Sequence, residues 1–216
     1  MHNMEKVNEQ INSKFIILGD FYDSFSRLPF HIEIDKNLIR SKIIVPFREK
    51  LKYLLPKLEI YDSNHIIQET TKCIDKRYYV ITMDDGTYFT QYDYNFNITR
   101  TAYKLENIRK GPYFRVPRDE GRDIITQAQH LHDNYIANGN QKSIVLCDDG
   151  IGTGKSLEKI LSILNELRIE VNKIYVLLNP NKTISIRNKD IETIFGFDED
   201  FAWLSERDLF WGLPRS

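Results

Sequence analysis

The chain has 216 residues, 41% of them hydrophobic, so it is long enough to bury a sizeable core without disulfides. Its 30 basic and 31 acidic residues almost cancel, which gives no electrostatic case for broad binding to nucleic acid or to anionic lipid. Cys73 and Cys147 form no disulfide framework, no apolar run approaches the ~20 residues of a membrane span, and the polar N-terminus lacks a signal-peptide core, so we expect a cytoplasmic protein.

The first half of the chain is rich in aromatic and β-branched residues. Lys14 to Leu18 is predicted to form a short strand, and Arg48 to Leu55 a short helix. Two β-rich runs, 77–83 and 87–94, flank Asp84-Asp85-Gly86. An Asp-Gly turn between two such runs predicts a β-hairpin.

The second half of the chain has an α/β pattern. Apolar residues recur at helical spacing over 124–135 and again over 157–164. Ser143 to Cys147 is a short apolar strand, and Lys173 to Leu178 is another, which Asn179-Pro180 ends. A strand, a helix and a strand at this spacing predict a βαβ unit, in which the two strands are parallel.

Two stretches near the C-terminus, 191–195 and 209–212, are predicted to add further strands, and the acidic, aromatic run from Phe197 to Trp203 a short helix. We therefore predict an α/β fold, a parallel sheet flanked by helices with a β-rich N-terminal region. Residues 1–118 form that region and could serve as a hood or accessory part. Residues 119–216 form the α/β core, and the two parts are expected to make one compact unit.

The turn after the first apolar strand of the βαβ unit has the composition of a phosphate-binding loop. Ligands of open α/β sheets sit beyond the carboxyl ends of the strands, where glycines let the backbone approach a ligand closely. The helix that begins near Lys155 directs its free N–H groups and its positive dipole end to the same place. The loop residues are Gly150, Ile151, Gly152, Thr153, Gly154, Lys155 and Ser156.

Two adjacent carboxylates, Asp148 and Asp149, precede this loop. Because carboxylates repel phosphate, they are expected to face another part of the ligand, and two neighbouring acceptors suit the cis-diol of a ribose. A ligand with a 5-phosphate, a free diol and a Mg²⁺-bound pyrophosphate would use all of these groups. That ligand is 5-phosphoribosyl 1-pyrophosphate.

Residues 144–157, IVLCDDGIGTGKSL, resemble the signature of the type I phosphoribosyltransferases. That signature has four apolar residues, two acidic residues and a Thr-Gly-x-Thr/Ser loop that opens a helix, and every position is filled here. The resemblance implies a phosphoribosyltransferase that uses Mg²⁺ bound through its ligand and releases pyrophosphate. It further implies that Asp148 and Asp149 bind the ribose diol and that the loop binds the 5-phosphate. Members of this fold often dimerise, so a homodimer is also an expectation.

Two further segments are candidates for the rest of the site. Arg109 and Lys110 begin a basic segment that Gly and Pro interrupt, and in the family a basic loop upstream of the signature closes over the pyrophosphate. A solvated basic loop explains the segment equally well. Trp211, Gly212 and Arg215 lie in a C-terminal run that fits a pyrophosphate loop, a hood that covers the base, or an edge strand with packed aromatics.

Other functions remain open at this point. A non-catalytic sensor or regulatory module, or one associated with defence, would bind phosphoribosyl pyrophosphate or a nucleotide without turnover. Thr153 to Ser156 also resembles the end of the nucleotide-binding motif G-x-x-x-x-G-K-S, but that motif needs glycine where this chain has Asp149. A glycine-rich connection without any ligand is the plainest alternative. The acceptor of the phosphoribosyl group is not identified by any motif.

Overall fold

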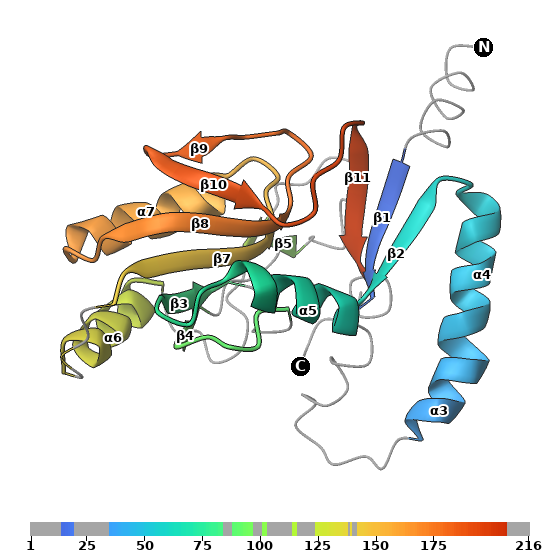
Figure 1. The fold of residues 1–216 in the computed structure, drawn as a ribbon, viewed down its shortest axis with the longest axis horizontal. Coiled ribbons are helices and arrows are strands. Elements are labelled where there is room, and N and C mark those ends of the chain that lie inside the picture. Colours follow the sequence, from blue (N-terminus) through green and yellow to red (C-terminus); the bar gives the residue numbers. More distant parts are fainter. Residues whose placement is uncertain are drawn as a thin grey trace. The chain divides into compact units, whose positions relative to one another are not determined.

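The computed structural model describes residues 14–19, 35–83, 88–96, 101–102, 114–115, 124–137, 139 and 142–206. The chain divides into two compact units (Figure 1). Unit 1 comprises residues 1–68 and 197–216, and unit 2 comprises residues 69–196. Across the described residues, no helix has both the length and the apolar character needed to cross a bilayer.

Unit 1 contains a three-stranded parallel sheet in the order β11-β1-β2. Its strands are β1 (Lys14–Gly19), β2 (Leu58–Asp62) and β11 (Phe201–Ser205). The strand predicted at residues 14–18 is therefore confirmed. Ile16, Ile17 and Leu18 are at most 1% exposed, so β1 is the buried central strand of this sheet.

Strand β11 corrects a prediction, because the run from Phe197 to Trp203 was expected to be a short acidic helix. Phe201 is buried and Ala202 is exposed, an alternation typical of a strand with one buried face. Residues 201–205 pair in register with residues 14–18 of β1. This long-range pairing, together with the strand preference of the aromatic residues, outweighs the acidic character of residues 198–200.

The helices of unit 1 form one continuous run, α3 (Lys36–Ile39), the π-helix η1 (Arg40–Ile44) and α4 (Val45–Leu54). The helix predicted at residues 48–55 is confirmed, although it begins earlier than expected, with Pro46 in its first turn. The chain continues from β2 into α5 (Ser63–Cys73), which begins in unit 1 and ends in unit 2. The described part of residues 1–118 thus carries helices as well as strands.

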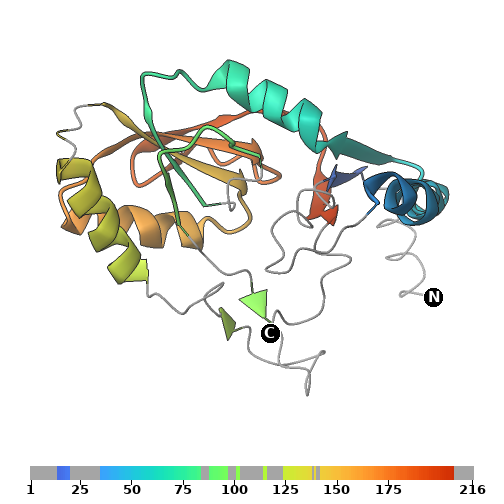
Figure 2. The same cartoon turned by 90° about the horizontal axis from the view of Figure 1, so that it is seen from below.

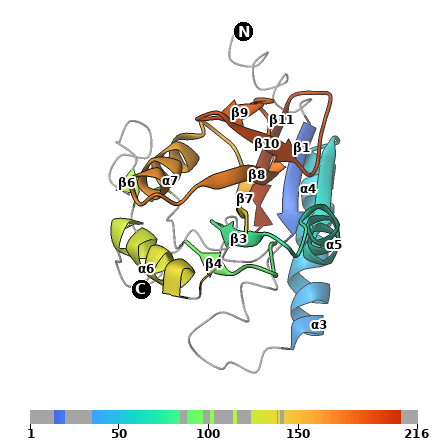
Figure 3. The same ribbon diagram turned by 60° about the vertical axis from the view of Figure 1, so that its left-hand side comes forward.

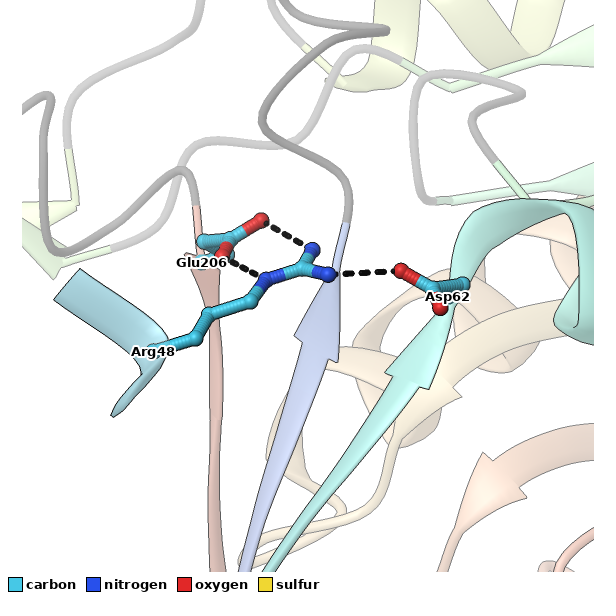
Figure 4. A network of polar contacts seen from close by, with 3 residues as sticks. All are labelled: Arg48, Asp62 and Glu206. Atoms are coloured by element: carbon cyan, nitrogen blue, oxygen red, sulfur yellow. Dashed lines mark hydrogen bonds and ion pairs between the residues drawn. The ribbon is translucent and has the colours of Figure 1, made fainter. Parts of the chain in front are cut away.

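Arg48, Asp62 and Glu206, which we call the Arg48 cluster, meet at the carboxyl ends of the unit 1 strands (Figure 4). Arg48 donates from Nε and Nη2 to the carboxylate of Glu206 at 2.8 and 2.9 Å, and from Nη1 to Asp62 at 2.7 Å. Burial alone would lower the pKa of Arg48, but hydrogen bonds and charge from the two carboxylates outweigh it and raise that pKa. A Cβ at Gly19 would lie 2.6 Å from Arg48 Nη2, so the glycine lets the guanidinium cross the end of β1.

Unit 2 contains a six-stranded sheet in the order β4-β3-β7-β8-β10-β9. All neighbouring strands are parallel except β9, which is antiparallel to β10. Two short strands, β5 and β6, form a separate antiparallel pair. The bounds are β3 (Tyr79–Thr82), β4 (Tyr94–Asn95), β5 (Thr101–Ala102), β6 (Phe114–Arg115), β7 (Ile144–Gly150), β8 (Val171–Leu178), β9 (Ser185–Ile186) and β10 (Lys189–Thr193).

The pairing of β3 shows that the predicted hairpin is wrong. Tyr79 to Thr82 pairs in parallel with both β4 and β7, whereas a hairpin would require an antiparallel partner. All four residues of β3 are buried, as expected for a strand inside a parallel sheet whose two faces are both covered. Residues 84–87, which include the Asp-Gly turn, lie outside the described residues.

Two helices, α6 (Ile124–Ala137) and α7 (Lys155–Glu166), lie on the same side of the unit 2 sheet (Figures 2 and 3). Leu157, Ile160, Leu161 and Leu164 of α7 are each at most 5% exposed, and they belong to the same core cluster as Leu146 of β7. This spacing places the four side chains on one face of the helix. The predicted helices and the parallel βαβ unit of β7, α7 and β8 are therefore confirmed.

The boundary predicted near residue 118 does not mark the point in the sequence where the unit 2 sheet begins. Strand β3, at residues 79–82, pairs with β7 although it lies far upstream of that boundary. The boundaries between the two units lie after residues 68 and 196 instead. The separate roles given to residues 1–118 and 119–216 stay a prediction.

Candidate functional site

Strand β7 ends at Gly150, so the acidic pair lies within the strand and not in a turn after it. Asp148 is paired with Val176 of β8, and Gly150 with Leu178. The strand predicted at residues 143–147 therefore extends three residues further than expected. Pairing with β8 keeps these residues extended up to the carboxyl end of the strand.

The two carboxylates leave β7 on opposite faces because side chains alternate along a strand. Asp148 continues the row of Ile144 and Leu146, which contribute to the core cluster shared with α7. Asp148 is half-buried, and its Oδ1 accepts a hydrogen bond from the backbone N–H of Asp149 at 2.9 Å. Asp149 lies on the other face and is 6% exposed, with its Oδ2 fully buried.

A four-residue loop, Ile151 to Gly154, connects β7 to α7. Ile151 fixes the start of this loop, because its backbone N–H donates to the carbonyl of Leu178 at 2.9 Å and its side chain lies in the core. Gly154 ends the loop in the left-handed conformation, with φ 72° and ψ −7°. Its carbonyl accepts the N–H of Glu158 at 2.9 Å, which closes the first turn of α7.

The backbone amides at the start of α7 point to an anion site. Within the part of the chain that the structure describes, the N–H groups from Gly152 to Leu157 donate to no protein acceptor, and α7 has no side-chain cap. Gly152, Thr153 and Lys155 are exposed, so a ligand can approach the loop. Free amides and the positive end of a helix dipole together favour a bound anion.

The turn after β8 supports this loop, a contact that the sequence did not predict. Asn181 Nδ2 donates to the carbonyl of Gly152 at 2.8 Å. Ile186 of β9 lies so close to Gly154 that a Cβ added there would be 2.9 Å from Ile186 Cδ1. The sequence signal is the Asn-Pro-Asn run that ends β8, because the carboxyl ends of adjacent parallel strands meet at one edge of the sheet.

Five of the predicted site residues cannot be placed. Arg109 and Lys110 of the basic segment lie outside the described residues, as do Trp211, Gly212 and Arg215 of the C-terminal run. Their roles stay predictions. The structure brings together Asp148, Asp149 and the residues from Gly150 to Ser156 at the carboxyl ends of the parallel strands of unit 2.

A cavity of about 300 Å³ lies at the opposite ends of those strands. Tyr78 and Val80, at the start of β3, line it together with Lys142, which precedes β7. The residues from Gly150 to Ser156 do not contribute to its lining. The cavity thus lies at the amino ends of the strands, where parallel sheets do not usually bind ligands.

Comparison with known families agrees with this geometry. The sequence model of one protein family, the phosphoribosyl transferase domain, matches residues 99–206, which is half of the chain. The match includes β7, α7 and β8 in full. The chain has no match among curated proteins and none among solved structures.

The chain therefore belongs to the phosphoribosyl transferase domain family. This confirms the resemblance seen in residues 144–157 and the predicted fold class, a mixed α/β fold with a parallel sheet flanked by helices. Membership of the family supports phosphoribosyl transfer as the general activity of the chain.

Proposed function

We propose that the loop from Gly150 to Ser156 binds the 5-phosphate of 5-phosphoribosyl 1-pyrophosphate, and that the protein transfers the phosphoribosyl group from it to an acceptor. The observation that carries this proposal is the run of amides from Gly152 to Leu157, which have no acceptor among the described residues. This run begins two residues after β7, whose last three residues are Asp148, Asp149 and Gly150. A phosphate monoester offers the acceptors that these donors need.

The loop supplies further groups for a phosphate. Thr153 is exposed and Ser156 is half-buried, and both carry hydroxyl groups that can donate to phosphate oxygens. Lys155 is exposed and adds a positive charge. Gly150 and Ile151 act differently, since both are tied to Leu178 of β8 and thereby fix where the loop begins.

Asp148 is the first candidate to bind the ribose diol. Its carboxylate is half-buried beside the loop, and an ionised carboxylate only accepts hydrogen bonds, so it suits hydroxyl donors. Asp149 is proposed as a second acceptor from the opposite face of β7. A ribose held at both its phosphate and its diol presents the anomeric carbon in a fixed orientation, and such positioning is a large source of catalytic rate.

Mg²⁺ is proposed to enter with the pyrophosphate. The described residues contain no group of three or more metal-ligating side chains, and Mg²⁺ in phosphate sites commonly uses phosphate oxygens, waters and one or two carboxylates. Asp148 fits such a donor set. When bound, Mg²⁺ would neutralise charge on the pyrophosphate. Arg109 and Lys110 are proposed to close over the same group and to stabilise the charge that develops on it.

The geometry disfavours a nucleotide P-loop. The strand continues through Asp149 and Gly150, which leaves the four residues 151–154 between β7 and α7. A P-loop of the form G-x-x-x-x-G-K-S would begin with a glycine at position 149 and would need six residues there. A sensor that binds phosphoribosyl pyrophosphate without turnover differs from an enzyme only in the reaction, so an activity measurement separates the two.

Calorimetric titration with phosphoribosyl pyrophosphate and Mg²⁺ tests the binding site. We expect Asp148→Asn to weaken binding about 10- to 100-fold, because a hydrogen bond to a charged group contributes about 1.5–3 kcal/mol. Asp190→Asn, an exposed aspartate on β10, is the matched control and should bind like the wild type. Equal affinity of Asp148→Asn and the wild type would remove the assignment of Asp148.

Pyrophosphate release tests the reaction itself. The wild type is incubated with phosphoribosyl pyrophosphate, Mg²⁺ and a panel of purines, pyrimidines and amines. Release that depends on one acceptor and is reduced in Asp148→Asn would support transfer. Tight binding without release in the presence of any acceptor would favour the sensor.

A further inference from the structure

We propose that Asn181 is a positioning residue that aims the backbone N–H of Thr153 at the bound phosphate. This inference rests on the proposed function and adds a residue to the same site. Asn181 lies in the turn after β8, outside the signature loop. Among the described residues, its hydrogen bond to the loop reaches the carbonyl of Gly152, so it acts through the backbone and not through the ligand.

The geometry of one peptide group carries the argument. Asn181 Nδ2 donates to the Gly152 carbonyl oxygen at 2.8 Å. The peptide between Gly152 and Thr153 is planar and trans, so its C=O and its N–H point in opposite directions. Holding the carbonyl toward Asn181 therefore turns the N–H of Thr153 away from Asn181. Within the described residues, no other hydrogen bond fixes this peptide.

The turn that carries Asn181 is itself fixed by a buried side chain. Asn179 is 9% exposed, its Oδ1 accepts the N–H of Thr183 at 3.0 Å, and its Nδ2 donates to the carbonyl of Thr183 at 2.8 Å. Asn179 Nδ2 also approaches Thr193 Oγ1 of β10 at 3.2 Å. The donor of Asn181 is thus placed by the sheet before any ligand arrives, which lowers the entropy cost of ordering the loop.

The same segment supports the loop at a second point. Ile186 is 6% exposed and belongs to the core cluster, and its Cδ1 lies where a Cβ at Gly154 would come within 2.9 Å. A hydrogen bond therefore holds the loop at Gly152, and Ile186 leaves room only for glycine at position 154. Both constraints come from residues 181–186, so this segment limits the conformation of the loop.

Substitution of Asn181 should weaken binding more than it weakens the fold. Asn181 is exposed, so water can replace its hydrogen bond to Gly152 and the melting temperature should change little. Loss of one neutral hydrogen bond that orders a binding loop corresponds to about a 3- to 10-fold loss in affinity. Asn181→Asp should lose at least as much as Asn181→Ala, because its carboxylate cannot donate and repels the Gly152 carbonyl.

The test combines calorimetry with ¹⁵N relaxation of the Thr153 amide in the ligand-free protein. Asn181→Ala and Asn181→Asp are compared with Asn165→Ala, an exposed asparagine near the C-terminal end of α7. We expect both Asn181 variants to bind phosphoribosyl pyrophosphate with Mg²⁺ about 3- to 10-fold more weakly, and to show greater mobility of Thr153. The control should match the wild type in both readouts.

The two readouts separate this inference from the proposed function. Absence of binding by the wild type would overturn the proposed function, whereas greater mobility of Thr153 in the Asn181 variants would still support the positioning of the loop. Unchanged mobility of Thr153 would overturn the role of Asn181 whether or not the wild type binds. Greater mobility with unchanged affinity would also overturn it, because the orientation of Thr153 would then not matter for binding.

Discussion

Polar groups gather at the carboxyl ends of parallel strands in both units, but the protein satisfies them differently. In unit 1, the guanidinium of Arg48 makes a two-point contact with Glu206 and a further bond to Asp62 (Figure 4). In unit 2, the amides from Gly152 to Leu157 find no acceptor among the described residues. The strand ends of unit 1 are joined by their own side chains, whereas the loop after β7 in unit 2 presents hydrogen-bond donors to a ligand.

This difference teaches that position in the fold does not by itself make a ligand site. Parallel sheets collect polar groups at this edge as a rule. The Arg48 cluster contains its own counter-charges and joins residues 158 positions apart in sequence, so its role is structural. The amides from Gly152 to Leu157 have no acceptor among the described residues and so can donate to a ligand from outside.

The largest expected effect comes from breaking the Arg48 cluster. Arg48→Ala leaves the carboxylate of Glu206, which is fully buried, without its counter-charge. Removing one partner of a buried pair typically destabilises a protein by about 3–5 kcal/mol. Urea denaturation followed by circular dichroism measures the loss. Arg48→Met with Glu206→Leu should recover much of it, and a loss below about 1 kcal/mol in Arg48→Ala would contradict the structural role.

A smaller effect is expected at the end of the phosphate loop. Gly154→Ala places a side chain at φ 72° and brings its Cβ within 2.9 Å of Ile186 Cδ1. Backbone strain of this kind costs about 1–3 kcal/mol, which thermal unfolding would detect. Ile186→Val added to Gly154→Ala should restore part of the stability, because it removes the contact but not the strain in φ.

Gly152→Ala is the matched control for that variant. A Cβ at Gly152 meets no atom within 4 Å, so its effect on stability should stay within about 0.5 kcal/mol. Equal losses in the two glycine variants would show that the conformation of Gly154 is not special. Full recovery in the double variant would show that the contact with Ile186, and not the left-handed backbone, is the source of the loss.

Much of the candidate site could be predicted because its signals are local. The apolar strand, the acidic pair, the glycines and the helical spacing from Leu157 to Leu164 all lie within one short stretch. Each constrains the backbone directly around it, through burial, turn geometry or helix capping. The parallel arrangement of β7 and β8 followed from the length of the connection alone.

Features that depend on distant partners could not be predicted in this way. Residues 201–205 form a strand because they pair with residues 14–18, and no pattern near residues 201–205 predicts this pairing. Strand β3 likewise takes parallel neighbours instead of the nearby run across the Asp-Gly turn. The role of Asn181 could not be predicted, because its contact with Gly152 exists only once β7 and β8 lie side by side.

Mapping the amides that respond to ligand tests the central claim most directly. In ¹H–¹⁵N spectra, addition of phosphoribosyl pyrophosphate with Mg²⁺ should shift the amide signals from Gly152 to Leu157 more than that of Asn165 near the far end of α7. The size of the shifts should follow ligand concentration to saturation. Unmoved signals from Gly152 to Leu157 in a protein that binds the ligand, or shifts gathered instead around Tyr78 and Lys142, would contradict the account.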